Sequence, residues 1–239
     1  MKSKTKNSLI IVLCLIIVLA FTGCGKSDAE KAMDSAAESA NALLDSNAKP
    51  YDASTKKNLK KAVAKSEDAD SEKEYTKVTK EIKSASKAYQ DSIKQLKQVT
   101  KPKQSFLLER AKKVDTITSV EAATEKTDPN NLINKDGAYY AYIAMKSSMV
   151  EEMEPDLYTN DSPLEAGNAG GAVIEAFKTV KDAKNRSDYL ASLHGPGLFW
   201  SGTSKVVGTL VVRTSEELTA SQEKKLEKDI IKELLRLDD

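Results

Sequence analysis

The sequence predicts an α+β protein in which a small N-terminal helical bundle precedes a domain with a sheet of about three strands packed by helices. Three observations support this division. Apolar residues recur at helical spacing in the first hundred residues, whereas the apolar and aromatic runs typical of strands come later. Glycine is absent between Lys26 and Asp136, and eight glycines lie between Gly137 and Gly208. Residues 26–103 hold 17 lysines against 13 acidic residues, while residues 104–239 hold 17 Lys and Arg against 23 acidic residues.

The overall composition excludes several classes of protein. The chain has 239 residues, with 37 Lys and Arg against 36 Asp and Glu, and a formal charge of +1 gives no general attraction to nucleic acid. Two cysteines and one histidine are too few for a disulfide scaffold, a four-ligand zinc site or a multi-histidine metal centre. No cofactor is expected. The length suits one or two domains with modest cores.

Residues 1–23 have the parts of a secretory signal peptide. Three lysines precede Leu9–Phe21, a stretch of thirteen apolar residues, and small residues follow it. Thirteen residues fall short of the roughly 20 that a helix needs to cross a bilayer. A cleaved signal is therefore favoured over a permanent transmembrane anchor.

The end of this segment, Leu19-Ala20-Phe21-Thr22-Gly23-Cys24, resembles the lipobox of bacterial lipoproteins. Gly23 and Cys24 match that pattern, and Phe21 stands where it prefers leucine. The resemblance implies that the Cys24 thiol receives a diacylglyceryl group, that cleavage makes Cys24 the N-terminus, and that acyl chains such as palmitate hold the protein to the membrane. The alternative is an ordinary secreted protein with a spare cysteine. Cleavage would also remove Cys14, which suits an oxidising exterior.

Residues 24–103 are predicted to form the lipidated N-terminus and a three-helix stalk module. A first helix ends before Pro50, whose ring removes a donor and disfavours helix in the preceding residue. A second helix starts near Ser54, and Ser71 with Glu74 fits the capping box of a third. The inward stripe of the third helix comprises Tyr75, Val78, Ile82, Ala85, Tyr89, Ile93 and Leu96.

The stretch from Tyr51 through Leu59, Val63 and Val78 to Ile82 resembles the FIVAR-type three-helix modules of bacterial surface proteins. That resemblance implies a spacer or binding module without chemistry. The many lysines of the third helix are interpreted as a solvated surface, because acidic residues are interspersed with them. Binding of wall polymers or phospholipid heads is the alternative.

Residues 104–239 are predicted to form an α+β interaction domain that folds alone. A helix at 106–114 is followed by a short helical turn at 118–123 and a turn at 128–131. The three predicted strands are 138–145, 172–177 and 206–212, and 147–170 is a long loop with at most one helical turn. Two further helices, capped by Thr179 with Asp182 and by Thr219 with Gln222, are expected on one face of the sheet.

This half resembles an uncharacterised domain found at the C-terminus of envelope proteins of Gram-positive bacteria. The stretches that carry the resemblance are 128–140, 170–178 and 206–222. It implies an α+β fold and an envelope location, and no activity comes with it.

Candidates for catalysis and metal binding are few. His194 precedes Gly195-Pro196-Gly197 and is the only imidazole, but no cysteine or nucleophile elbow accompanies it. A histidine at a helix end interacts favourably with the helix dipole without any catalytic role. Asp128, Asn130 and Asp136 lack the glycine of an EF-hand loop. The acidic loop 151–165 can collect a cation, although like charges in one loop are more often solvated.

The aromatic residues offer a binding surface instead. Strand alternation places Tyr140 and Tyr142 on one face of the strand and Tyr139 on the other. Together with Trp200, Tyr140 and Tyr142 are the predicted ligand-binding residues.

Two functions follow from these observations. The favoured one is a lipoprotein on the extracytoplasmic face of the bacterial cell membrane, anchored through Cys24, that presents a non-catalytic domain to an envelope protein, peptide or glycan. The alternative is an envelope hydrolase or metal-dependent enzyme that uses His194 and the acidic loop 151–165.

Overall fold

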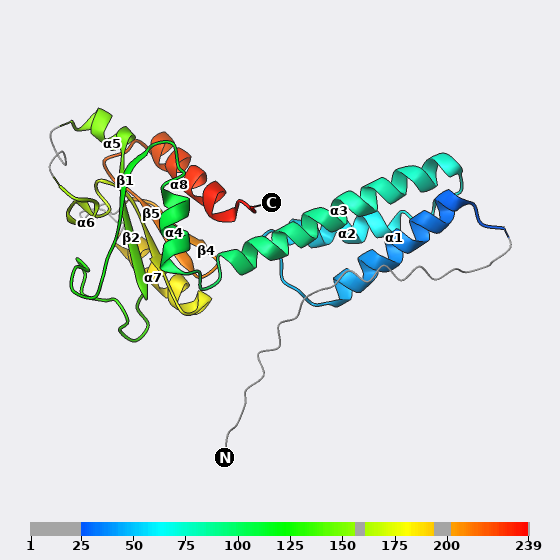
Figure 1. Cartoon of the computed structure of the whole chain (residues 1–239), viewed down its shortest axis with the longest axis horizontal. Coiled ribbons are helices and arrows are strands. Elements are labelled where there is room, and N and C mark those ends of the chain that lie inside the picture. The colour runs from blue at the N-terminus through cyan, green and yellow to red at the C-terminus, as the bar shows by residue number, and fades with distance from the viewer. Residues whose placement is uncertain (1–24, 156–160, 194–201, 239) are drawn as a thin grey trace, which may run out of the picture.

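The computed structural model describes residues 25–155, 161–193 and 202–238, and a helical part precedes an α+β part in it (Figure 1). Cys24, His194 and Trp200 lie outside the described residues. In the described part of the chain, no helix is both long and apolar enough to span a membrane.

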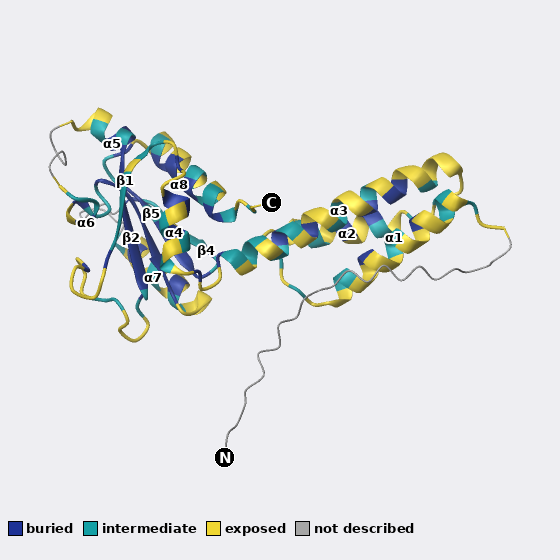
Figure 2. Ribbon diagram, in the orientation of Figure 1, coloured by how far each residue is buried: buried dark blue, intermediate teal, exposed yellow. Residues whose placement is uncertain are grey.

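The three predicted stalk helices are present as α1 (Asp28–Asp45), α2 (Ala53–Ala64) and α3 (Glu72–Gln98). Their buried residues form one hydrophobic cluster between the helices, and the buried positions are coloured dark blue in Figure 2. Fully buried members of this core include Leu59, Ile82 and Tyr89. The capping box predicted at Ser71 does not form, because the Glu74 carboxylate accepts from the Asp70 N–H instead.

The stalk has two distinct ends. Helix α1 starts beside the start of α3, where burial and then the charge of Glu30 raise the pKa of Tyr75. Helix α3 has 27 residues and therefore extends about 40 Å. Its C-terminal end enters the α+β domain (Figure 1). The first described residues, from Gly25, thus lie at the end of the stalk that is remote from this domain.

The residue after α3 belongs to the core of the α+β domain. Val99 is fully buried there, and its carbonyl accepts a 3.0 Å hydrogen bond from the N–H of Thr209. The side-chain amide of Gln98 donates to two backbone carbonyls at the end of α8 (Ala220–Leu235). This core therefore extends upstream of residue 104, where the domain boundary was expected.

The sheet has five antiparallel strands rather than three, in the order β1-β2-β3-β5-β4. The strands are β1 (Ile117–Ala122), β2 (Ala141–Ser147), β3 (Gly171–Ala176), β4 (Ser204–Val207) and β5 (Leu210–Thr214).

Two features account for the additional strands. The segment expected to form a helical turn at 118–123 instead pairs with β2 as β1. The single strand expected at 206–212 lies across the hairpin of β4 and β5, because Gly208 adopts φ 62° in a two-residue turn. Apolar residues flank this turn on both sides, so the hairpin resembles one continuous strand in sequence.

Helices cover both faces of the sheet, and the prediction that the last two helices share one face is wrong. α8 and α4 (Gln104–Ala111) pack on the first face, in the cluster that contains Ile143 and Ile174. α7 (Val180–Ser192) and α6 (Pro163–Ala166) pack on the second, in the cluster that contains Val173. Every residue of β2 and β3 is buried as a result (Figure 2). A further helix, α5 (Ser148–Met153), follows β2 directly.

Candidate functional site

Three charged side chains meet between α7 and the sheet. Glu175 on β3 is fully buried, and its carboxylate accepts two 2.8 Å hydrogen bonds from Nε and Nη2 of Arg186 on α7. Arg213 on β5 donates from Nη1 to the same carboxylate at 3.2 Å. Two cations thus surround one buried anion, and the bidentate geometry holds the Arg186 guanidinium in a fixed orientation.

The ion pair leaves part of Arg186 available at the surface. Burial acts to lower the pKa of Arg186, but hydrogen bonds to Glu175 and its charge outweigh burial and raise the pKa. The side chain is 16% exposed, and its Nη1 has no hydrogen-bond partner among the described residues. A positively charged donor is therefore held at the surface by a buried carboxylate.

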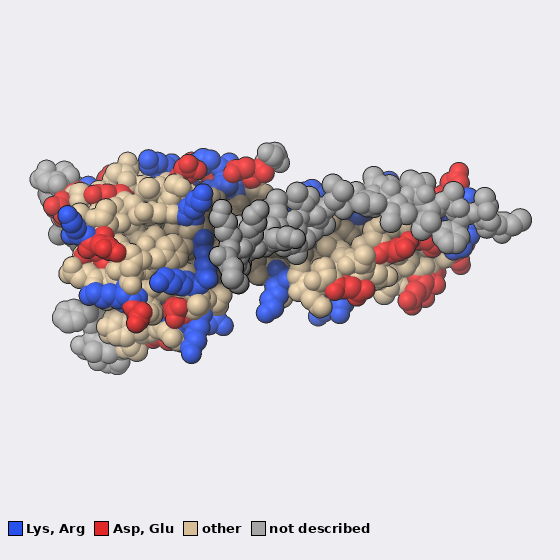
Figure 3. All heavy atoms as spheres, turned by 60° about the horizontal axis from the view of Figure 1, so that its bottom comes forward, with Lys and Arg blue, Asp and Glu red and all other residues tan. Residues whose placement is uncertain are grey.

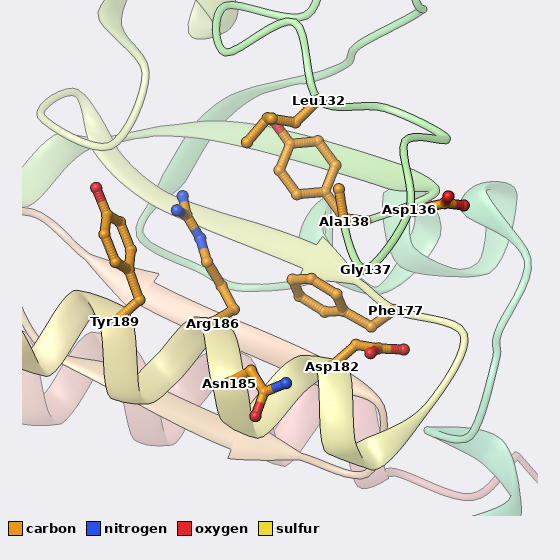
Figure 4. A pocket seen from close by; sticks show the side chains of 10 residues that line it. Leu132, Asp136, Gly137, Ala138, Phe177, Asp182, Asn185, Arg186 and Tyr189 are labelled. Carbon is orange, nitrogen blue, oxygen red and sulfur yellow. The ribbon is translucent and has the colours of Figure 1, made fainter.

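Arg186 lines a shallow hollow of about 280 Å³ between α7 and the loop before β2 (Figure 4). Phe177 and Tyr139, both buried, form its apolar floor, and their rings meet edge to face at 6.1 Å. The hollow is lined by Leu132, Asp136, Gly137, Ala138, Tyr139, Phe177, Asp182, Asn185, Arg186 and Tyr189.

One wall of the hollow is a single face of α7. Asp182, Asn185, Arg186 and Tyr189 follow the spacing of three and four residues that places side chains on one side of a helix. The predicted cap is confirmed, since the Thr179 side chain accepts from the N–H of Asp182. Tyr189 is 56% exposed, and the guanidinium of Arg186 lies 5.7 Å from its ring centroid. This wall combines planar polar groups with an exposed aromatic ring.

The opposite wall, residues 132–138, is held in place by Asp128. The carboxylate of Asp128 is 4% exposed and accepts four hydrogen bonds, from the hydroxyl of Tyr139 and from the backbone N–H groups of Asn130, Leu132 and Ile133. Burial alone would raise the pKa of Asp128, but these four bonds outweigh it and lower the pKa. Asp128 thus has a structural role.

The tyrosines predicted to form a binding surface are not arranged as expected. Tyr142 is 2% exposed, and burial raises its pKa to about 12. Its ring contacts Tyr139 at 5.5 Å, whereas Tyr140 packs on the other face of the sheet and donates its hydroxyl to the carbonyl of Pro102. Alternation fails here because β2 begins only at Ala141, after both Tyr139 and Tyr140. Tyr140 and Tyr142 therefore do not form a shared exposed platform.

Two acidic side chains of the loop 151–165 are hydrogen-bonded to hydroxyl residues. Glu151 accepts from the hydroxyl of Thr118, and Glu165 completes the capping box of α6 with Ser162. Among the described residues, no cluster of three or more His, Cys, Asp or Glu side chains is suited to a metal ion.

A second hollow, of about 450 Å³, lies on the stalk between α2 and α3. It contains no aromatic side chain and is lined by Thr55, Asn58, Lys80, Glu81, Ser84, Ala85 and Ala88. The hollow at α7 has the richer combination of donors, acceptors and aromatic rings.

The buried ion pairs were missed in the sequence, although a signal for them exists. Glu175 interrupts an apolar strand, and Arg213 follows another apolar run directly. Charged residues are almost never fully buried unless they are paired, so two such interruptions indicate a pair across neighbouring strands. The comparisons with protein-family models, curated proteins and solved structures found no match to this chain.

Proposed function

We propose that the protein is a lipoprotein of the Gram-positive cell envelope. In this proposal Cys24 is acylated, helices α1–α3 form a spacer, and the α+β domain is a non-catalytic binding module on the extracytoplasmic side of the membrane. The observation that carries the proposal is the position of the two ends of the stalk.

Cys24 immediately precedes the first described residue, and the described chain begins at the end of the stalk that is remote from the α+β domain. An anchor at Cys24 would therefore hold this domain about 40 Å away, by the length of α3. The contacts of Val99 and Gln98 join α3 to the domain without a flexible linker. Such an arrangement suits a protein that must reach a ligand beyond the membrane surface.

The charge distribution favours a local binding site over a broad electrostatic surface. On the face shown in Figure 3, basic and acidic side chains are interspersed on the α+β domain, whereas on the visible part of the stalk most basic side chains lie near the domain and most acidic ones lie farther from it. An extended surface of one sign is what attracts long charged polymers. The hollow at α7 is therefore the binding site that we assign to the module.

The alternative function is an enzyme based on His194 and the acidic loop 151–165. His194 is outside the described residues, and Glu151 and Glu165 make the hydrogen bonds to Thr118 and Ser162 given above.

Metabolic labelling with an alkyne fatty acid tests the anchor. The wild-type protein should be labelled and should sediment with membranes, whereas Cys24→Ala should lose both properties, because only a thiolate at this position can receive the diacylglyceryl group. Two acyl chains are needed for stable attachment, since each buried methylene contributes about 0.8 kcal/mol.

Cys14→Ala is the matched control. Cys14 lies within the apolar stretch that cleavage removes, so this variant should be labelled like the wild type. Equal labelling of the Cys24→Ala variant would refute lipidation at Cys24.

A further inference from the structure

We infer that the hollow at α7 binds a single uncharged sugar unit of a glycan. This inference rests on the proposed binding function and adds the chemical class of the ligand.

The size of the hollow fits one small unit of a larger ligand. Pockets for drug-sized molecules have volumes of about 300–1,000 Å³ and enclose most of the ligand. This hollow, of about 280 Å³, falls just below that range and is open to solvent. A ring of a longer chain can therefore enter it while the neighbouring units remain outside.

The polar groups surround an apolar floor. Phe177 and Tyr139 provide the floor, and the side chains of Asp136, Asp182 and Asn185 stand at the rim (Figure 4). A pyranose ring has the complementary form, with apolar C–H groups on its faces and hydroxyls around its edge. Carboxylates accept from hydroxyls, the amide of Asn185 can donate and accept, and planar groups suit pairs of neighbouring hydroxyls.

The local charge disfavours an anionic ligand. Glu175 neutralises one of the two guanidinium groups, and Asp136 and Asp182 add two negative charges at the rim. The charged side chains that line the hollow are Asp136, Asp182 and Arg186, and their charges sum to −1, which disfavours an acidic sugar or a phosphate. Nη1 of Arg186 remains a donor that can bind a neutral hydroxyl oxygen.

Tyr189 is the aromatic residue best placed to contact the ligand. Three large apolar side chains are exposed among the described residues, namely Met153, Val180 and Tyr189, and Tyr189 is the most exposed of them. It stands at the rim beside Arg186 (Figure 4). Aromatic anchors carry a disproportionate share of binding energy, and their truncation commonly weakens binding tenfold or more.

The test uses residues 25–239, which lack Cys24 and therefore carry no lipid, so that its outcome is independent of acylation. The neutral probes are maltotriose, mannotriose and tri-N-acetylchitotriose; trigalacturonic acid and hexalysine serve as an acidic and a basic probe. Binding is followed through backbone amide NMR shifts. At least one neutral trisaccharide should bind with a dissociation constant of about 1 mM, the affinity typical of a small contact, and shift the amides of residues 136–138 and 182–189.

Three variants locate the site. Tyr189→Ala and Asn185→Ala should each weaken binding about tenfold, and both residues are exposed, so that folding is preserved. Met153→Ala changes an exposed side chain on α5 and should bind like the wild type. The inference is overturned if none of the neutral probes binds, if only trigalacturonic acid or hexalysine binds, if the shifts lie elsewhere, or if Tyr189→Ala binds as tightly as Met153→Ala.

Discussion

The segment Gln95–Lys103 should contribute to the free energy of unfolding of the α+β domain, although it precedes the boundary that the sequence indicates. Comparing two fragments tests this: the fragment of residues 104–239 lacks Val99, and the fragment of residues 95–239 retains it. Both fragments contain all five strands and the helices that pack on them.

The magnitude follows from two contacts of Val99. Complete burial of a valine side chain contributes about 1.5–3 kcal/mol. The N–H of Thr209 would also lose its acceptor, the carbonyl of Val99; an unsatisfied buried donor costs about 1–3 kcal/mol. Truncation should thus lower the free energy of unfolding by about 2.5–6 kcal/mol. Domains of this kind have total stabilities of about 5–15 kcal/mol.

Urea unfolding followed by far-UV circular dichroism measures the difference. With a slope of about 1–3 kcal/mol per molar urea, the midpoint of fragment 104–239 should be lower by about 1 M or more. In fragment 95–239, Val99→Ala should reproduce only the part of this loss that comes from side-chain burial, because the carbonyl of residue 99 still accepts from Thr209. Lys97→Ala, which changes an exposed side chain, should stay within about 0.5 kcal/mol of the parent. Equal midpoints for the two fragments would refute the reasoning.

Three further predictions concern buried groups. Glu175→Gln should lower the free energy of unfolding by about 3–5 kcal/mol in urea titrations, because it leaves two largely buried guanidinium groups without a counter-charge; a loss below 1 kcal/mol would contradict this. The pKa of Asp128 is lowered in the folded state, so its contribution to stability is present above the ordinary aspartate pKa of about 3.9 and is lost as the pH falls through the lower folded value. Unfolding measured from pH 5 to pH 2 should therefore depend more steeply on pH in the wild type than in Asp128→Asn, and identical slopes would argue against this role. Gly208→Ala should destabilise the protein by more than Gly137→Ala in thermal melts. Both glycines have positive φ, which costs about 1–3 kcal/mol for other residues, but only at Gly208 would the new Cβ meet a backbone atom, at 2.4 Å from the carbonyl oxygen of Val99; equal melting temperatures would refute the close approach.

The stalk helices and the later caps are determined by the sequence alone. The stripe through Val78, Ile82 and Tyr89 is buried as predicted, because a 27-residue amphipathic pattern fixes which face of a helix is apolar. The capping box of Thr219 with Gln222 is also confirmed, since all of its partners lie within one turn. Both features depend on neighbours three or four residues apart.

The number of strands depended on pairing between distant segments. Residues 117–122 alternate weakly and contain Thr118, Ser119 and Glu121, so their strand conformation is stabilised by the ladder to β2 rather than by their own pattern. The turn at Gly208 can likewise be recognised only from the pairing of Val207 with Leu210 in the sheet.

The position and the lining of the candidate site depend almost entirely on the tertiary structure. Its floor residue Phe177 follows β3 and one wall comes from α7, whereas the opposite loop is fixed by Asp128, which lies 49 residues before Phe177 in the chain. Periodicity reports which faces of an element are apolar, but not which elements share a face of the sheet. The sequence could therefore determine the helical stalk and the caps of the later helices, whereas the meeting of Glu175 with Arg186 and the hollow above it depend on packing between elements that only the folded chain brings together.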